Sequence, residues 1–368
     1  MTLNHSIKPF MPAPHGGNVY EVSRKLGTTP SQLLDFSASI NPLGMSRAAK
    51  RRLIESVDLV CHYPDSELLD LTRALARYYG VPAEQILIGR GTTELVYHLA
   101  RALRPQRALL VTPLFGEFTV ALALTGTEIN SECLTESTGF ALDIARIERW
   151  LTEEKVDLCV IANPNNPTGQ LIDQKAIDYL IRVADERETD LLIDEAFIDF
   201  VPGASAVNRL QESQRLLILR SLTKFFGIPG CRVGCLLAHS SRLAELSWGR
   251  EPWLVDTLAQ VTAIASLEDQ HYQVATRALV TRERGYLMER LQAISWLKPY
   301  PSVANFVLMR ILDPMISAEQ LAERLLADRI LVRNCSDFGG LDSRFIRVAV
   351  RRREENGKLL TALENAFS

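Results

Sequence analysis

The stretch RSLTKFFGIPGCR, residues 220–232, decides the fold class of this chain. It follows RLLIL (215–219), a short apolar run typical of a buried strand, so Lys224 is expected just beyond the carboxyl end of a strand. In open α/β sheets, ligands bind at that edge. A lysine placed there, among hydroxyl residues and ahead of a glycine-proline loop that ends in arginine, is therefore the first candidate for a functional group.

Composition and charge are those of an ordinary globular protein. The 368 residues are 47% hydrophobic and 23% charged, which is enough apolar mass for two domains. With 41 basic and 44 acidic residues, the bulk charge gives no support for binding to nucleic acid or to a membrane surface. There is no apolar signal segment and no run of eighteen apolar residues, so we expect a cytoplasmic protein. The six scattered cysteines form no C-x-x-C pair, and we expect no metal site.

Short apolar runs alternate with helical patterns through the middle of the chain. The runs lie at 85–89, 107–112, 156–162, 190–194, 215–219 and 233–238. Such strands, separated by helices, indicate a mostly parallel sheet covered on both faces. A long helical pattern at 255–295, followed by shorter strand-like and helix-like segments, indicates a smaller α+β domain. We expect a large domain over 48–264 and a small domain over 265–368, completed by an N-terminal arm over 1–47.

Four loops that follow strands carry the residue types that a phosphorylated aromatic cofactor needs. GRGTTE (89–94) opens a helix, whose free amides can bind an anion, although Thr92 is equally well explained as a helix N-cap. NPNNPTG (163–169) contains two Asn-Pro steps and holds its amide side chains rigidly, although a simple turn would explain it too. Because the loops share one edge of the sheet, their side chains can converge.

The other two loops carry charge. In DEAF (194–197), Asp194 ends a buried strand, so its carboxylate must have a partner or a shifted pKa. The partner could be a protonated ring nitrogen, the backbone amide of a helix start or a cation in an internal salt bridge. In the opening stretch, Lys224 can form a Schiff base if its pKa is lowered, although alone it is better explained as a solvated loop lysine. Three further donors for a phosphate follow the same strand: Ser221, Thr223 and Arg232.

Taken together, these loops resemble the fold type I, aspartate aminotransferase-like family of pyridoxal-phosphate enzymes. The resemblance covers nearly the whole chain and implies an α/β fold with a mostly parallel seven-stranded sheet. It implies pyridoxal 5'-phosphate as cofactor, with Lys224 as its Schiff-base lysine and Asp194 on the ring nitrogen. It implies that Asn166 binds the ring 3'-oxygen and Phe115 stacks on the ring. The phosphate ligands would be the Thr92 and Thr93 amides, Ser221, Thr223, Arg232 and, from the neighbouring subunit of a homodimer, Tyr63.

Within the family, several segments resemble decarboxylases of L-threonine O-3-phosphate more closely than histidinol-phosphate aminotransferases, which remain the alternative. They are HGGN (15–18), DFSASINPLG (35–44), DEAFIDF (194–200), RSLTKFFGIPG (220–230) and LVRNCSDFGGLDSRFIRVAVR (331–351). Phe197 also stands where most relatives have tyrosine. The resemblance implies that Arg347 binds the substrate carboxylate, and that Arg333, His15 and Asn41 bind the substrate phosphate. A non-catalytic regulator on the same scaffold is a further alternative, but no helix-turn-helix pattern is evident.

Overall fold

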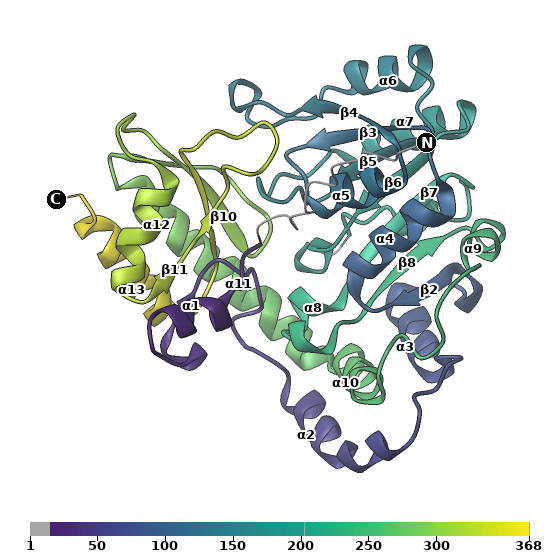
Figure 1. The fold of residues 1–368 in the computed structure, drawn as a ribbon, viewed down its shortest axis with the longest axis horizontal. Coiled ribbons are helices and arrows are strands. Elements are labelled where there is room, and N and C mark those ends of the chain that lie inside the picture. Colours follow the sequence, from purple (N-terminus) through teal and green to yellow (C-terminus); the bar gives the residue numbers. More distant parts are fainter. Residues whose placement is uncertain (1–14, 202, 368) are drawn as a thin grey trace, which may run out of the picture.

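The large part of the molecule is built on one seven-stranded sheet (Figure 1). The structure is a computed structural model that describes residues 15–201 and 203–367. Six strands run in one direction and β8 runs antiparallel to both of its neighbours, which confirms the expected mostly parallel sheet. In spatial order the strands are β2 (Ile86–Gly89), β8 (Gly234–Ala238), β7 (Leu216–Ser221), β6 (Asp190–Asp194), β5 (Leu158–Ala162), β3 (Arg107–Thr112) and β4 (Glu128–Cys133).

Helices cover both faces of this sheet, which explains why its central strands are apolar without alternation. Every residue of β5 is buried, and successive side chains enter different cores: Val160 packs with the helices of one face and Ile161 with those of the other. One face carries α4 (Gly91–Leu103), α5 (Glu117–Leu124) and α9 (Ser240–Leu246). The other carries α3 (Leu69–Tyr79), α6 (Ile144–Glu153), α7 (Gln174–Glu186) and α10 (Thr257–Glu268).

A second, smaller layer lies beside the large sheet, where α11 (Gln270–Gln292) leads into it (Figure 1). Its antiparallel sheet has the order β12-β13-β10-β9 and packs on three helices. The elements are β9 (Leu297–Pro299), β10 (Phe306–Ile311), β12 (Arg333–Asn334), β13 (Phe345–Ala349), α11, α12 (Ala318–Ala327) and α13 (Arg353–Asn365).

The N-terminal segment joins this smaller layer. After α1 (Val19–Lys25), strand β1 (Leu34–Asp35) pairs in parallel with β11 (Ile330–Leu331). Helix α2 (Arg47–Glu55) then returns the chain to the large part. The domain boundaries that we expected stay predictions, and α10 runs across the second of them.

Two features differ from the sequence expectation. The helical pattern at 255–295 is two helices, because Asp269 ends α10 and its carboxylate accepts the Tyr272 N–H at 3.0 Å to cap α11. Strand β4 was not expected, since its sequence EINSEC is polar; it lies at the sheet edge, where one buried face is enough. Among the described residues, no helix combines the length and apolar character needed to cross a membrane.

Candidate active site

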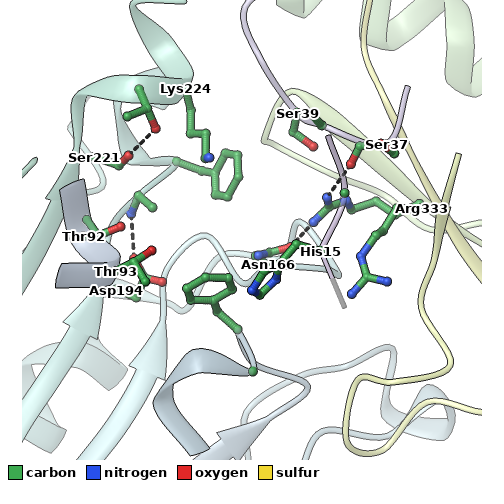
Figure 2. A pocket seen from close by; sticks show the side chains of 18 of the residues that line it. His15, Ser37, Ser39, Thr92, Thr93, Asn166, Asp194, Ser221, Lys224 and Arg333 are labelled. Carbon is green, nitrogen blue, oxygen red and sulfur yellow. Dashed lines mark hydrogen bonds between the residues drawn. The ribbon is translucent and has the colours of Figure 1, made fainter. Parts of the chain in front are cut away.

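The predicted site residues converge on one cavity at the carboxyl ends of the sheet strands, facing the smaller layer (Figure 2). Residues from the four predicted loops, from the N-terminal segment and from the smaller sheet all reach it. Twelve of the fourteen predicted residues line it: His15, Thr92, Thr93, Phe115, Asn166, Asp194, Ser221, Thr223, Lys224, Arg232, Arg333 and Arg347. Asn41 and Tyr63 do not.

One end of the cavity has the donors for a phosphate monoester. Helix α4 begins at Gly91, without a side-chain cap, so its first amides are available to an anion. Gly91 has φ +78°, and a Cβ there would lie 2.7 Å from Nη2 of Arg232. A Cβ on Gly234 would lie 3.0 Å from the Thr92 amide nitrogen. These two glycines therefore let the arginine and the helix start approach each other.

Two hydroxyl groups complete this end. Ser221 ends β7 and Thr223 lies in the short helix α8 (Leu222–Phe225) that follows directly. Their side-chain oxygens are 2.8 Å apart and both side chains are buried. Amides, hydroxyls and one guanidinium are the donor set that a phosphate prefers, so these residues fit the phosphate of the expected cofactor.

Lys224 and Asp194 give the cavity a titratable amine and acid. Figure 2 shows the Lys224 amine directed into the cavity. Loss of solvent lowers the pKa of Lys224 to about 8, assisted by the positive charges of Arg232 and Arg347. Asp194 ends β6, and one of its oxygens accepts the Ala196 N–H at 3.0 Å. Burial raises the pKa of Asp194 to about 6, so its carboxylate is a strong acceptor for a cationic ring nitrogen.

Arg347, on β13, spans the boundary between the two layers. It is 6% exposed and donates to Oδ1 of Asn166 and, at 3.1 Å, to the Ser37 carbonyl, while its guanidinium lies over the Phe306 ring. Its buried Nε has no hydrogen-bond partner among the described residues. Because Arg347 takes Oδ1 of Asn166, the remaining amide group of Asn166 is a donor, which suits an anionic ring oxygen.

Arg333 and His15 lie on the side of the cavity away from Thr92 and Ser221 (Figure 2). Arg333, on β12, pairs with the Asp337 carboxylate at 2.6 Å and lies over the Phe338 ring. The His15 ring lies 5.2 Å from the Phe115 ring, tilted by 34°. This end of the cavity therefore carries cationic or ionisable donors that the expected cofactor does not use.

The structure corrects the expectation for Asn41. That side chain is 3% exposed, and its amide donates to the Phe225 carbonyl at 2.6 Å and to the hydroxyls of Tyr272 and Thr276, each at 2.8 Å. It cannot also bind substrate, because its donors are used inside the protein. Ser39, two residues earlier, lines the cavity instead, and its buried Oγ has no hydrogen-bond partner among the described residues.

Tyr63 lies at the surface, outside the cavity. Its exposed fraction is 81%, and its ring stacks on Trp253 with centroids 4.8 Å apart. Its implied contact with the phosphate of a neighbouring subunit stays a prediction.

Phe197 lines the cavity as an apolar group. It is 5% exposed and packs edge-on against Phe306, with ring centroids 4.9 Å apart. A tyrosine here would add a hydroxyl donor to the cavity wall, and phenylalanine lacks that donor.

Sequence reasoning missed several residues around the cavity. Ser37 binds Arg347, Asp337 binds Arg333, and Glu117 binds His15. Ser37 and Asp337 lie within the sequence segments that carry the family resemblance, but nothing in those segments shows which arginine each one binds. Ser37 binds an arginine far away in the chain, and Asp337 binds one that precedes it closely.

Comparison with known proteins agrees with this geometry. The family described as aminotransferase class I and II matches residues 31–363. A threonine-phosphate decarboxylase of Salmonella typhimurium is 40% identical over 96% of each chain. Among solved structures, the histidinol-phosphate aminotransferase of Clostridium acetobutylicum has a TM-score of 0.84 and 31% identity, covering 90% of this chain and 98% of its own. The L-threonine-O-3-phosphate decarboxylase of Porphyromonas gingivalis has a TM-score of 0.80 and 25% identity, with the same coverage. The chain therefore belongs to the class I and II aminotransferase family.

Proposed function

We propose that this protein is a pyridoxal-phosphate-dependent decarboxylase that converts L-threonine O-3-phosphate into (R)-1-amino-2-propanol O-2-phosphate and CO2, a step in cobalamin biosynthesis. The 40% identity to a threonine-phosphate decarboxylase over nearly the whole chain supports this substrate. The observation that carries the proposal is the pair of arginines, Arg347 and Arg333, in the cavity beyond the donor set at Arg232. Two further cations suit a substrate that carries both a carboxylate and a phosphate.

The cofactor would be held at both ends and on one face. Thr92, Thr93, Ser221, Thr223 and Arg232 would bind its phosphate. Phe115 offers a flat apolar surface to the ring, and Asp194 a buried negative charge to the ring nitrogen. When bound, pyridoxal phosphate supplies a cationic ring that accepts the electrons released when a bond to the substrate Cα breaks.

Lys224 would act as nucleophile and as proton carrier. With a pKa of about 8, roughly one Lys224 amine in ten is neutral at pH 7, which makes it a far better nucleophile than an exposed lysine. The same amine can later deliver a proton to Cα in place of the departed CO2. Burial of the amine among cations thus prepares both roles before substrate arrives.

The arginines would orient the substrate. Arg347 lines the cavity, and its hydrogen bonds to Asn166 and Ser37 fix the guanidinium there, where it would bind a substrate carboxylate. Arg333 would bind the substrate phosphate, with Ser39 as a further hydroxyl donor in the place expected for Asn41. Anchoring both anionic groups fixes the direction of the carboxylate, and that direction decides which bond to Cα is cleaved.

Incubation with L-threonine O-3-phosphate tests the proposal. We expect stoichiometric CO2 and aminopropanol phosphate, and neither product from Lys224→Ala. Transfer of the amino group to a keto acid without CO2, with histidinol phosphate as donor, would instead establish the aminotransferase alternative.

We also propose a homodimer, in which Tyr63 reaches the cavity of the neighbouring subunit. Large apolar side chains are exposed around the connection between α2 and α3 and near residue 250, which suits an interface. They are Ile54, Val57, Leu59, Val60, Tyr63, Leu69, Trp248 and Trp253. Sedimentation of the purified protein as a dimer at micromolar concentration would agree, and a monomer would contradict it. A cytoplasmic location stays a prediction.

A further inference from the structure

A buried glutamate connects the N-terminal segment to the cavity wall. Glu117 is the first residue of α5 and is 4% exposed. One of its carboxylate oxygens lies 2.7 Å from Nε2 of His15, and the other accepts the Tyr97 hydroxyl at 2.6 Å. Both oxygens are thus occupied, so the carboxylate does not confront a ligand in the cavity directly.

Two glycines fix the chain that carries His15. A Cβ on Gly16 would lie 2.2 Å from the Ser37 carbonyl oxygen, so only glycine fits against that strand exit. The Gly17 N–H donates to the Ser37 hydroxyl at 2.8 Å, with Gly17 at φ +82°. This accounts for the sequence HGG: the glycines seat the segment on Ser37, and the histidine extends over the Phe115 ring.

The bond to Glu117 determines what His15 can offer to a ligand. The carboxylate accepts a hydrogen bond from the Nε2–H group, which leaves Nδ1 as the nitrogen available to the cavity. In the neutral ring that Nδ1 would be an acceptor, whereas in the imidazolium it is a donor. A ring with protons on both nitrogens can therefore donate to Glu117 and to a ligand in the cavity at the same time.

We infer that Glu117 is a positioning residue for substrate recognition, which holds the His15 ring by Nε2 and leaves Nδ1 for the phosphate of the substrate. This inference rests on the proposed function, because it assumes a phosphorylated substrate. Two further groups lie around this pair: the Tyr97 hydroxyl donates to the other Glu117 oxygen, and Arg333 with its partner Asp337 lines the same cavity. Because Asp337 already pairs with Arg333, a second ligand from His15 would strengthen the binding of a phosphate at this end of the cavity.

A double-mutant cycle on steady-state kinetics tests the dyad. Glu117→Gln keeps the size of the side chain but removes the charge, and His15→Asn removes the imidazole. We expect each to raise KM for L-threonine O-3-phosphate roughly 10- to 100-fold with little change in kcat, the range of one charge-assisted hydrogen bond. The double variant should be no worse than His15→Asn alone, because Glu117 acts only through His15. Independent, multiplicative losses would overturn the inference.

Glu132→Gln is a matched control. Glu132 is 5% exposed, accepts a hydrogen bond from the Trp150 indole and forms an ion pair with Arg146, but it lies outside the cavity lining. It should leave KM unchanged, so an equal rise in KM would show that loss of any buried glutamate charge has this effect and would refute a specific role for Glu117.

A second measurement does not depend on the substrate. In protein with 15N-labelled histidine, His15→Asn identifies the His15 signal among the six histidines. In the neutral ring, we expect the His15 proton to lie on Nε2, against the Glu117 carboxylate. Glu117→Met, which removes the acceptor, should lose this preference, and Glu132→Met should keep it. An unchanged proton position in Glu117→Met would overturn the dyad. If the unmodified protein releases no CO2 from threonine phosphate, the proposed function fails, and the position of this proton still decides the role of Glu117.

Discussion

Replacement of Gly91 by alanine should weaken cofactor binding far more than it weakens the fold. Alanine at φ +78° costs about 1–2 kcal/mol of backbone strain. Its Cβ would also lie 2.7 Å from Nη2 of Arg232. Because Nη2 is the end of a flexible side chain, the guanidinium can move away at little further cost to stability, but it then leaves the phosphate position. Loss of that charge-assisted contact is worth about 1.5–3 kcal/mol, or roughly 10- to 150-fold in the dissociation constant.

Gly126→Ala provides the control, because Gly126 has φ +77° but no atom within 4 Å of the added Cβ. The two variants should lose similar free energy of unfolding, measured by urea titration of the cofactor-free proteins. Only Gly91→Ala should bind pyridoxal phosphate more weakly, measured by absorbance titration. If both variants bind the cofactor equally tightly, the proposed phosphate position between Gly91 and Arg232 is wrong.

Three other perturbations have defined outcomes. Between pH 8 and 10.5 the unfolded chain holds the Lys224 proton more tightly than the folded one. The free energy of unfolding of the cofactor-free protein should therefore rise with pH over this range, by roughly 3 kcal/mol at most. Urea titrations of Lys224→Met should lack this rise, and an identical rise in that variant would contradict the lowered pKa. Arg333→Ala should cost roughly 2–4 kcal/mol in kcat/KM for threonine phosphate and little in cofactor affinity; an equal loss with unphosphorylated threonine would exclude Arg333 as the phosphate ligand. Arg220→Met should lower the free energy of unfolding by about 3–5 kcal/mol, because it leaves the buried Glu195 and Asp199 without their cation. If the variant unfolds thermally at the same temperature as the unmodified protein, the stabilising role of that pairing is contradicted.

The large sheet and most of the site could be predicted because the informative residues stand at strand ends. The ends of β6 and β7 are Asp194 and Ser221, and parallel strands bring such ends to one edge. Lys224 follows within one turn of helix, so its position needed no long-range information. Local sequence and one topological rule were sufficient here.

The rest could not be predicted, because it depends on which way a side chain turns or on contacts between distant segments. Ser39 and Asn41 are two residues apart in the same segment, and only the folded chain shows that Asn41 binds the Phe225 carbonyl while Ser39 faces the cavity. Glu117 gains its role from His15, 102 positions earlier in the chain. Neither composition nor periodicity contains that contact.

Borohydride reduction of the protein loaded with pyridoxal phosphate, followed by digestion and mass spectrometry, tests the central claim most directly. The buried amine at the end of β7 should carry the cofactor, so the label should lie on the peptide that contains Lys224 and should be absent from Lys224→Ala. A label on another lysine, or none, would contradict the account.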